Sequence, residues 1–139
     1  MQDLTVKTYE YLPREALALR EEVFLVEQGF EIERDEIDDI AEHIVIYDKD
    51  IVVGVARLYV SDGMTIGRIC VKKDYRKKGL GGLLLDTGEK IARDKGHDTI
   101  KLHAQTRATA FYARYGYVAY GEVAYEEWCE HIWMKKALL

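Results

Sequence analysis

The 139-residue sequence has little that would staple or interrupt a fold: two cysteines, one proline and no long hydrophobic run. Cys70 and Cys129 lie far apart, with no neighbouring cysteine or histidine at zinc-ligand spacing, so we expect reduced thiols and no metal site. The longest apolar runs, such as residues 51–56, fall well short of the roughly 20 residues that span a bilayer. The N-terminus shows neither the basic nor the apolar segment of a secretion signal. These absences favour a cytoplasmic protein without a membrane partner.

An excess of positive charge is also missing, because 20 basic residues face 25 acidic ones, for a net charge of −5. Such a surface disfavours nucleic acid as a partner, since nucleic-acid binding depends on neutralising phosphates. The length is close to the usual size of one domain, and no repeat, low-complexity stretch or linker divides the sequence. We therefore predict a single domain over residues 1–139.

Hydrophobic periodicity predicts strands and helices in the order β-α-β-β-β-α-β-α-β-β. The strands are expected at residues 4–9, 43–47, 51–60, 64–71, 99–104, 117–120 and 131–135, and the helices near residues 13–29, 80–95 and 106–115. The first helix carries an apolar stripe at helical spacing, made of Leu12, Ala16, Leu19, Val23 and Val26. This order is typical of a mixed α/β (α+β) sheet layered with helices.

An acidic stretch runs from Glu31 to Glu42, with seven acidic residues and one basic residue, and is expected to be a loop or a short helix. It is either a solvated acidic loop or a surface that attracts a cationic amine. Arg57 and Arg68 lie in predicted strands, where an arginine usually needs a carboxylate partner. Such partners could be Glu27 or the Asp38–Asp39 pair, or the arginines could bind an anionic ligand group. The charge pattern alone does not fix the sign of a ligand.

The segment from Val71 to Gly82 combines the end of a strand, a basic cluster, several glycines and the start of a helix. Between Arg68 and Lys78, six residues are basic and one is acidic. A helix N-terminus presents unpaired N–H groups, and glycines let a phosphate approach the backbone. The pattern R-x-x-G-x-G is neither a P-loop nor a dinucleotide fingerprint. It indicates a pyrophosphate site, although a glycine-rich helix start with solvated lysines has the same composition.

Two blocks of this sequence resemble one enzyme family. Arg76-Lys-Lys-Gly-Leu-Gly81, following a strand that ends in valine, resembles the acetyl-CoA motif of the GNAT superfamily of N-acetyltransferases. Gln105-Thr-Arg-Ala-Thr-Ala-Phe-Tyr112, followed by Tyr115-Gly-Tyr117, is similar to the family's N-x-x-A-x-x-[LF]-Y…G-F block, with Gln for Asn and Tyr for Phe. The resemblance extends over nearly the whole chain. Residues 20–28, 67–71, 104–105 and 131–134 resemble a small bacterial branch of single-domain members.

This resemblance implies a GNAT fold, with a mixed, mostly antiparallel sheet of about six or seven strands flanked by helices. It implies acetyl-CoA as the acetyl donor and a primary amine of a small molecule as the acceptor. Acetylation of a protein lysine or N-terminus, or a CoA-binding regulatory module without turnover, are the alternatives. A homodimer is also consistent with the resemblance, since many relatives pair through edge strands.

The resemblance further implies which residues hold the cofactor. Backbone groups of the strand at residues 69–71 are expected to pair with the pantetheine arm and the acetyl carbonyl, and backbone amides of residues 77–82 to bind the pyrophosphate. The predicted cofactor-binding residues are Ile69, Cys70, Val71, Arg76, Lys77, Lys78, Gly79, Leu80, Gly81, Gly82, Gln105, Ala108, Phe111 and Tyr112.

Catalysis requires a proton for the leaving thiolate and a base for the amine. Tyr112 matches the family residue that faces the thioester sulfur, and a phenol with a pKa of about 10 can protonate a thiolate of about 8.5. Without the resemblance, Tyr112 would be taken for a core tyrosine. His131 is the first candidate for the base, against a purely structural role or a carboxylate such as Glu27 acting through water. The predicted acceptor-binding residues are Arg20, Phe24, Glu27, Gln28, Arg57 and Arg68.

Overall fold

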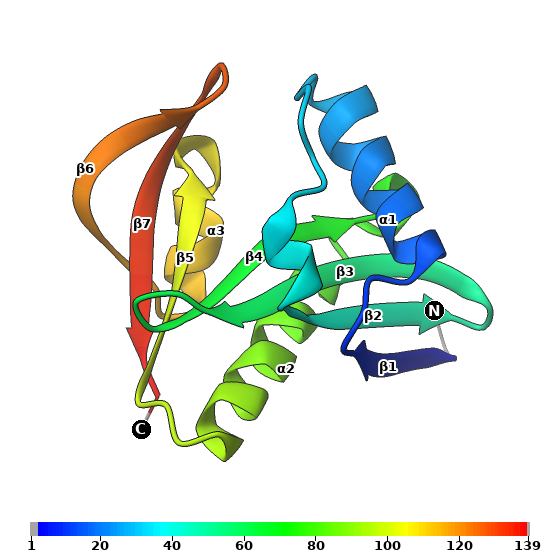
Figure 1. The fold of residues 1–139 in the computed structure, drawn as a ribbon, viewed down its shortest axis with the longest axis horizontal. Coiled ribbons are helices and arrows are strands. Elements are labelled where there is room, and N and C mark those ends of the chain that lie inside the picture. The colour runs from blue at the N-terminus through cyan, green and yellow to red at the C-terminus, as the bar shows by residue number, and fades with distance from the viewer. Residues whose placement is uncertain (1–2, 139) are drawn as a thin grey trace.

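The computed structural model describes residues 3–138 and contains a seven-stranded sheet with helices packed on both faces (Figure 1). The strands are β1 (Leu4–Tyr9), β2 (Glu42–Asp48), β3 (Ile51–Val60), β4 (Met64–Val71), β5 (Thr99–Gln105), β6 (Val118–Glu126) and β7 (Cys129–Ala137). The helices are α1 (Arg14–Arg20), α2 (Leu80–Asp94) and α3 (Thr109–Arg114), with the π-helix η1 (Glu21–Glu27) and the 3-10 turns η2 (Glu36–Asp39), η3 (Lys73–Tyr75) and η4 (Thr106–Ala108). The predicted order of strands and helices is confirmed.

The central strands are buried on both faces, which explains their continuous apolar runs. On one face, Ile44 and Ile46 of β2 belong to the same packed cluster as Leu84 of α2. On the other face, Val45 lies in a second cluster with Leu19 of α1. Successive residues of a strand point to opposite faces, so β2 supplies both cores. The half of the sheet formed by β1–β4 is thereby fixed between α1 and α2.

The sheet opens between β4 and β5. Its strand order is β1-β2-β3-β4-β5-β7-β6, and neighbouring strands are antiparallel except for β4 and β5. These two parallel strands share one registered pair, Thr65 with Lys101, and then diverge (Figure 1). The register of β4 with β3 also shifts near Arg68, whose φ is +46°. Beyond Thr65, β4 therefore has no paired strand on its β5 side within the described residues.

The first helix changes type along its length. α1 passes without a break into η1, where the N–H of Gln28 donates to the carbonyl of Val23 at 3.1 Å, an i→i+5 bond. The predicted apolar stripe is correct for Ala16, Leu19 and Val23 but wrong for Val26, which is 80% exposed. An α-helical phase does not hold through a π-helix, because its turn is wider.

The C-terminal hairpin is longer than predicted. β6 continues beyond residue 120 to Glu126, and β7 begins at Cys129, so a short turn joins two nine-residue strands. Their register shifts between Tyr120 and Ala124. Within residues 3–138, no helix is long and apolar enough to cross a bilayer.

Candidate active site

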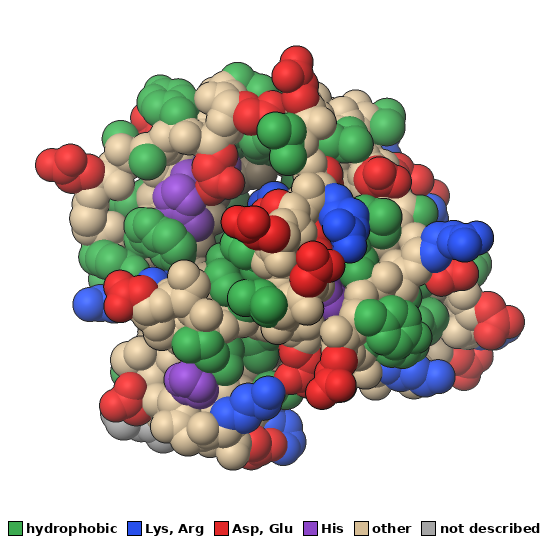
Figure 2. Space-filling model, viewed as in Figure 1, with side chains coloured by type: hydrophobic (Ala, Val, Ile, Leu, Met, Phe, Trp, Pro, Cys, Tyr) green, Lys and Arg blue, Asp and Glu red, His purple; other side chains and the backbone are tan. Residues whose placement is uncertain are grey.

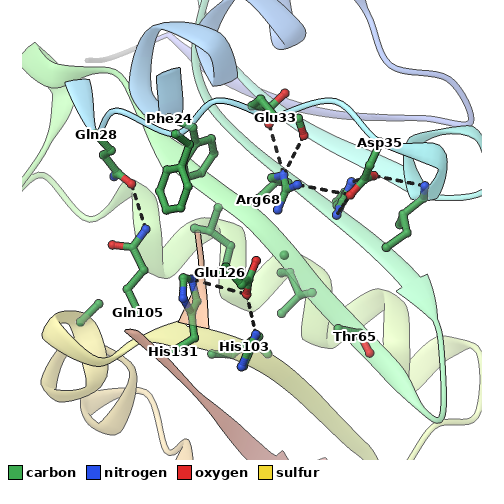
Figure 3. Close-up of a pocket in the computed structure, with 18 of the residues that line it drawn as sticks. Phe24, Gln28, Glu33, Asp35, Thr65, Arg68, His103, Gln105, Glu126 and His131 are labelled. Carbon is green, nitrogen blue, oxygen red and sulfur yellow. Dashed lines mark hydrogen bonds and ion pairs between the residues drawn. The ribbon is translucent and has the colours of Figure 1, made fainter. Parts of the chain in front are cut away.

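A cavity of about 410 Å³ lies where β4 and β5 diverge, covered by residues of η1 and of the loop that follows it (Figure 3). On the face shown in Figure 2, acidic side chains gather over the middle of the view, where this loop crosses the sheet. The lining residues are Phe24, Gln28, Phe30, Ile32, Glu33, Asp35, Ile37, Arg57, Tyr59, Thr65, Ile66, Gly67, Arg68, Ile69, Leu102, His103, Gln105, Ala108, Tyr112, Glu126, Glu127, His131 and Trp133. The cavity thus brings together most of the side chains predicted for catalysis and for the acceptor.

Two predicted acceptor-binding residues do not line the cavity. Arg20 is completely buried; its Nε donates to Glu33 at 2.5 Å, and its Nη1 and Nη2 donate to Asp38 at 2.7 and 3.0 Å. Glu27 instead forms an ion pair of 2.7 Å with Arg76. The predicted acceptor contacts of Arg20 and Glu27 are therefore corrected, because carboxylates enclose the first and an arginine of the glycine-rich loop engages the second.

The cavity wall next to α1 is an arginine–carboxylate network, formed by Arg20, Arg57 and Arg68 with Glu33, Asp35 and Asp38. Arg57 Nη1 donates to Asp35 at 2.5 Å and to Asp38 at 3.0 Å. Arg68 Nη2 donates to Asp35 at 3.2 Å (Figure 3). One predicted pairing, of Arg57 with Asp38, is confirmed. The interpretation of a wholly solvated acidic loop is wrong, because Glu33 and Asp38 are buried.

The network shifts the pKa of its own carboxyls. Burial alone would raise the pKa of Asp38, but hydrogen bonds from Arg20 and the charges of Arg20 and Arg57 outweigh it and hold that pKa well below its usual range. The pKa of Asp35 is lowered too, since Arg57 and Arg68 outweigh the cost of its burial. The network is not fully hydrogen-bonded, because Oε1 of Glu33 and Nε of Arg57 are buried without a partner.

The opposite wall carries a histidine–glutamate cluster, formed by His103 of β5, Glu126 of β6 and His131 of β7. Nδ1 of His103 lies 2.5 Å from Glu126 Oε2, and Nε2 of His131 lies 3.6 Å from the same oxygen (Figure 3). The two imidazole centroids are 5.0 Å apart, and His103 stacks on Trp133 at 4.6 Å. Burial lowers the pKa of His103 in spite of Glu126, so this ring is neutral at pH 7. His131, the predicted base, lies in this cluster.

Neither Glu126 nor His103 was among the residues predicted for the site. Pairing of β5 with β7 brings Gln105 opposite His131, and the register shift in β6 precedes Glu126. No periodic pattern marks Glu126, because its approach depends on the β6–β7 hairpin and its irregular register.

Tyr112, the predicted acid, lies on α3 at the cavity wall. Burial raises the pKa of its hydroxyl to about 12, which keeps the phenol protonated at neutral pH. Burial is the single cause of this shift, and no side chain within residues 3–138 contributes a hydrogen bond to it. Gln105, at the end of β5, donates to the side chain of Gln28 at 2.9 Å and so joins β5 to the end of η1 (Figure 3).

The glycines of the R-x-x-G-x-G motif serve two purposes. Gly79 precedes α2 with a φ of +86°, a conformation that glycine adopts without strain. A Cβ at Gly81 would collide with the ring of Phe111, and one at Gly82 with the ring of Tyr115. The last two glycines therefore allow α3 to pack closely on α2.

Some of the other predicted cofactor-binding residues line the cavity, and others have side chains that pack elsewhere. Ile69 and Ala108 line the cavity, whereas the side chain of Cys70 lies in the core beneath α1 and that of Leu80 in the core beneath α2. Phe111 packs on α2 rather than lining the cavity. The side chains of these three residues therefore do not line the cavity.

One of the basic residues of the glycine-rich loop is already bound to other residues. Arg76 Nε donates to the carbonyl of Val71 at 2.9 Å while its Nη2 pairs with Glu27, which ties the loop to η1. Lys77 and Lys78 are exposed beside Gly79. The free positive charge at this helix start therefore comes from the two lysines.

Comparisons with known proteins agree with this architecture. The chain matches the model of the acetyltransferase (GNAT) domain over residues 9–138. It is 42% identical over 120 residues to YjcF of Bacillus subtilis, an uncharacterized N-acetyltransferase, covering 84% of this chain and 85% of that protein. A Lactobacillus plantarum structure provisionally assigned as an N-acetyltransferase superposes with a TM-score of 0.89 at 29% identity, covering 99% of this chain and 100% of that one. An acyl-CoA N-acyltransferase of Pseudomonas aeruginosa gives a TM-score of 0.83 at 31% identity, covering 97% and 99%. Together with the sheet that opens between β4 and β5, these matches show that the chain belongs to the GNAT family of acetyltransferases.

Proposed function

We propose that this protein transfers the acetyl group of acetyl-CoA to a primary amine of a small molecule. The observation that carries the proposal is the divergence of β4 and β5 beside the start of α2, with a cavity in the opening. The volume of about 410 Å³ lies within the usual range of small-molecule sites. The cover formed by η1 and the following loop favours a small acceptor over a segment of a folded protein.

The residues present fit acetyl-CoA, which supplies the acetyl group as an activated thioester. Beyond Thr65, the free edge of β4 can hydrogen-bond to the amides of an extended arm. In α2, the N–H of Leu83 is bonded to the carbonyl of Gly79 at 3.0 Å, so the N–H groups of residues 80–82 have no acceptor in the preceding turn. With Lys77 and Lys78, these groups form an anion site for the pyrophosphate.

Three groups of the chain perform the chemistry. A backbone N–H of residues 69–71 orients the acetyl carbonyl and stabilises negative charge on its oxygen. Tyr112 donates its hydroxyl proton to the departing sulfur. His131 accepts the proton that the amine must lose before its nitrogen can attack. A CoA-binding module without turnover would need the first of these groups but not the last two.

Calorimetric titration with acetyl-CoA, with ATP and NAD as controls, tests the cofactor. We expect micromolar binding of acetyl-CoA alone, and about a tenfold or greater loss in Gly79→Leu, because a side chain there obstructs the anion site. Gly96→Leu is a matched control, since Gly96 follows the other end of α2 with the same φ of +86° and open space around its Cβ position. Equal affinity in both variants, or no binding at all, would contradict the proposal.

The catalytic claim has its own test, which is release of free thiol in the presence of amines. Tyr112→Phe should lower kcat about 10- to 100-fold while leaving the Kd for acetyl-CoA unchanged, because it removes a proton and little volume. An unchanged kcat would show that Tyr112 is not the acid.

A further inference from the structure

The histidine–glutamate cluster leaves two hydrogen-bond acceptors facing each other in the cavity. An ionised carboxylate can only accept hydrogen bonds. Because Glu126 Oε2 lies 2.5 Å from Nδ1 of His103, the proton of the neutral His103 ring is on Nδ1. The carbonyl of Cys129 accepts from Nδ1 of His131 at 3.0 Å, so a neutral His131 has its lone pair on Nε2. Nε2 of His131 lies 3.6 Å from Glu126 Oε2, which is also a hydrogen-bond acceptor without a proton. Two such acceptors require a proton donor beside them.

The donor can come from a molecule in the cavity. The side chain of Glu126 is 41% exposed and lines the cavity together with His131. A primary ammonium group carries three N–H bonds, so it can donate to both acceptors at once. Its positive charge also suits the carboxylate, which makes the hydrogen bond stronger than a neutral one.

The arginine–carboxylate network leaves no cation for an anionic acceptor. The basic lining residues within residues 3–138 are Arg57 and Arg68, and both pair with Asp35, at 2.5 and 3.2 Å. Four carboxylates line the same cavity: Glu33, Asp35, Glu126 and Glu127. The lining of the cavity therefore carries a net negative charge, and both of its arginines already pair with a carboxylate. A carboxylate or phosphate near the amine would meet repulsion without a partner.

The remaining wall is aromatic. Phe24 and Phe30 come from the covering segment, Tyr59 from β3 and Trp133 from β7, and all four are partly buried lining residues. Such surfaces suit a flat, apolar body of about the size of one ring.

We propose that the acceptor is a primary alkylammonium ion with a ring-sized apolar body and no anionic group, and that its nitrogen docks between Glu126 Oε2 and His131 Nε2. This inference rests on the proposed acetyl transfer and specifies its substrate class. His131 accepts the proton, Glu126 binds the charge, and His103 is a positioning residue that orients Glu126 through its Nδ1–H. The nitrogen bonds to the acetyl carbon as the carbon–sulfur bond breaks. Of the three ammonium protons, one stays on the amide, one passes through His131 to solvent, and one replaces the proton that Tyr112 gives to sulfur.

Three amines that differ at a single carbon test the substrate class by thiol release. 2-Phenylethylamine, phenylalaninol and phenylalanine share a ring and a primary amine, and carry hydrogen, a neutral hydroxymethyl group or a carboxylate beside it. We expect kcat/KM for the first two to exceed that for phenylalanine at least about tenfold, because only phenylalanine places a negative charge against the carboxylates.

Variants of the cluster test the docking site. Glu126→Gln should raise the KM for the amine about tenfold and lower kcat while the Kd for acetyl-CoA is unchanged, because the charge-assisted hydrogen bond is lost. Glu122→Gln, an exposed glutamate on the same strand and outside the cavity, should match the wild type. His103→Ala should also raise the KM, whereas His103→Asn, which retains an N–H donor near the position of Nδ1, should restore much of it.

The outcomes separate the two proposals. If acetyl-CoA binds but phenylalanine is used as well as phenylalaninol, or if Glu126→Gln behaves like Glu122→Gln, the docking inference is overturned and acetyl transfer stands. If acetyl-CoA binds and none of the three amines releases thiol, the docking inference is likewise overturned. Failure of acetyl-CoA to bind would overturn both proposals.

Discussion

The two walls of the cavity differ in how their charged groups are paired. In the arginine–carboxylate network, each of the six side chains has a group of opposite charge within 3.3 Å. Arg20 and Asp38 are buried. In the histidine–glutamate cluster, one partly exposed carboxylate faces two imidazoles, and neither Nε2 has a hydrogen-bond donor. Buried polar atoms without a partner occur in both walls, so they do not distinguish a structural wall from a reactive one. The pairing of charge does, because every carboxylate of the network faces an arginine, whereas Glu126 faces two imidazoles and, within the described residues, no arginine or lysine.

The difference follows from where the two walls belong in the sheet. The network joins α1 and the acidic loop to β3 and β4, so it holds the cover of the cavity on one half of the molecule. The cluster connects β5, β6 and β7 within the other half of the sheet. We expect damage to the network to appear as lost stability and damage to the cluster to appear as lost activity.

The largest expected effect is on the network. Asp38→Asn should lower the free energy of unfolding by about 3–5 kcal/mol, because it leaves the buried Arg20 without one of its charges and removes a partner of Arg57. Denaturant unfolding of the purified variant measures this.

The neighbouring aspartate is a matched control. Asp39 pairs with Arg34 at 3.2 Å, and both side chains are more than half exposed. Asp39→Asn should therefore change the unfolding free energy by less than about 0.5 kcal/mol. Equal losses in Asp38→Asn and Asp39→Asn would show that the network is no more important than a surface ion pair.

A second prediction separates the two walls by pH. Asp35 and Asp38 have lowered pKa values in the folded state, so their contribution to stability is present above the unfolded pKa of about 3.9 and is lost as pH falls through the folded values. His103 and the buried His43 also have lowered pKa values, so their contribution is present above about 6.5 and declines as pH falls below it.

Stability should consequently decline in two stages as pH is lowered, with a slope of up to about 1.4 kcal/mol per pH unit for each proton taken up. The first stage begins near neutrality, and His103→Asn should reduce it. The second begins below about pH 4 and comes from the network. Denaturant midpoints measured between pH 7 and pH 3 test this. A stability that stays level or rises on acidification would contradict the sign of these pKa shifts.

Local patterns in the sequence predicted much of the fold and one side of the site. The strands at residues 4–9, 51–60 and 64–71 have the predicted bounds, because alternation and turn residues are local signals. The glycine-rich helix start and Tyr112 on the cavity wall also follow from motifs with fixed spacing.

What the sequence did not predict depends on contacts between distant residues. Arg20 was expected to contact an acceptor, but its partner Asp38 comes from a loop whose path no periodicity specifies. Val26 was placed on the buried face because nothing in the sequence signals the change to a π-helix. Glu126 could not be singled out among nearby glutamates, since only the register of the β6–β7 hairpin brings it to His103.

The smallest expected effect is on stability when the cluster is altered. Glu126→Gln should change the unfolding free energy by no more than about 1 kcal/mol, although we expect it to impair the amine reaction. The amide oxygen can take the position of Oε2 and still accept from Nδ1 of His103, and the side chain is 41% exposed, so little desolvation is unbalanced. Removing the charge also relieves the repulsion between the carboxylate and the lone pair of His131. Denaturant unfolding of Glu126→Gln beside Asp38→Asn measures the contrast directly. A site that keeps its hydrogen-bond acceptors free for a ligand contributes little to folding stability when the ligand is absent. If Glu126→Gln lowered the free energy of unfolding as much as Asp38→Asn, the cluster would therefore be a structural element of the fold, like the network.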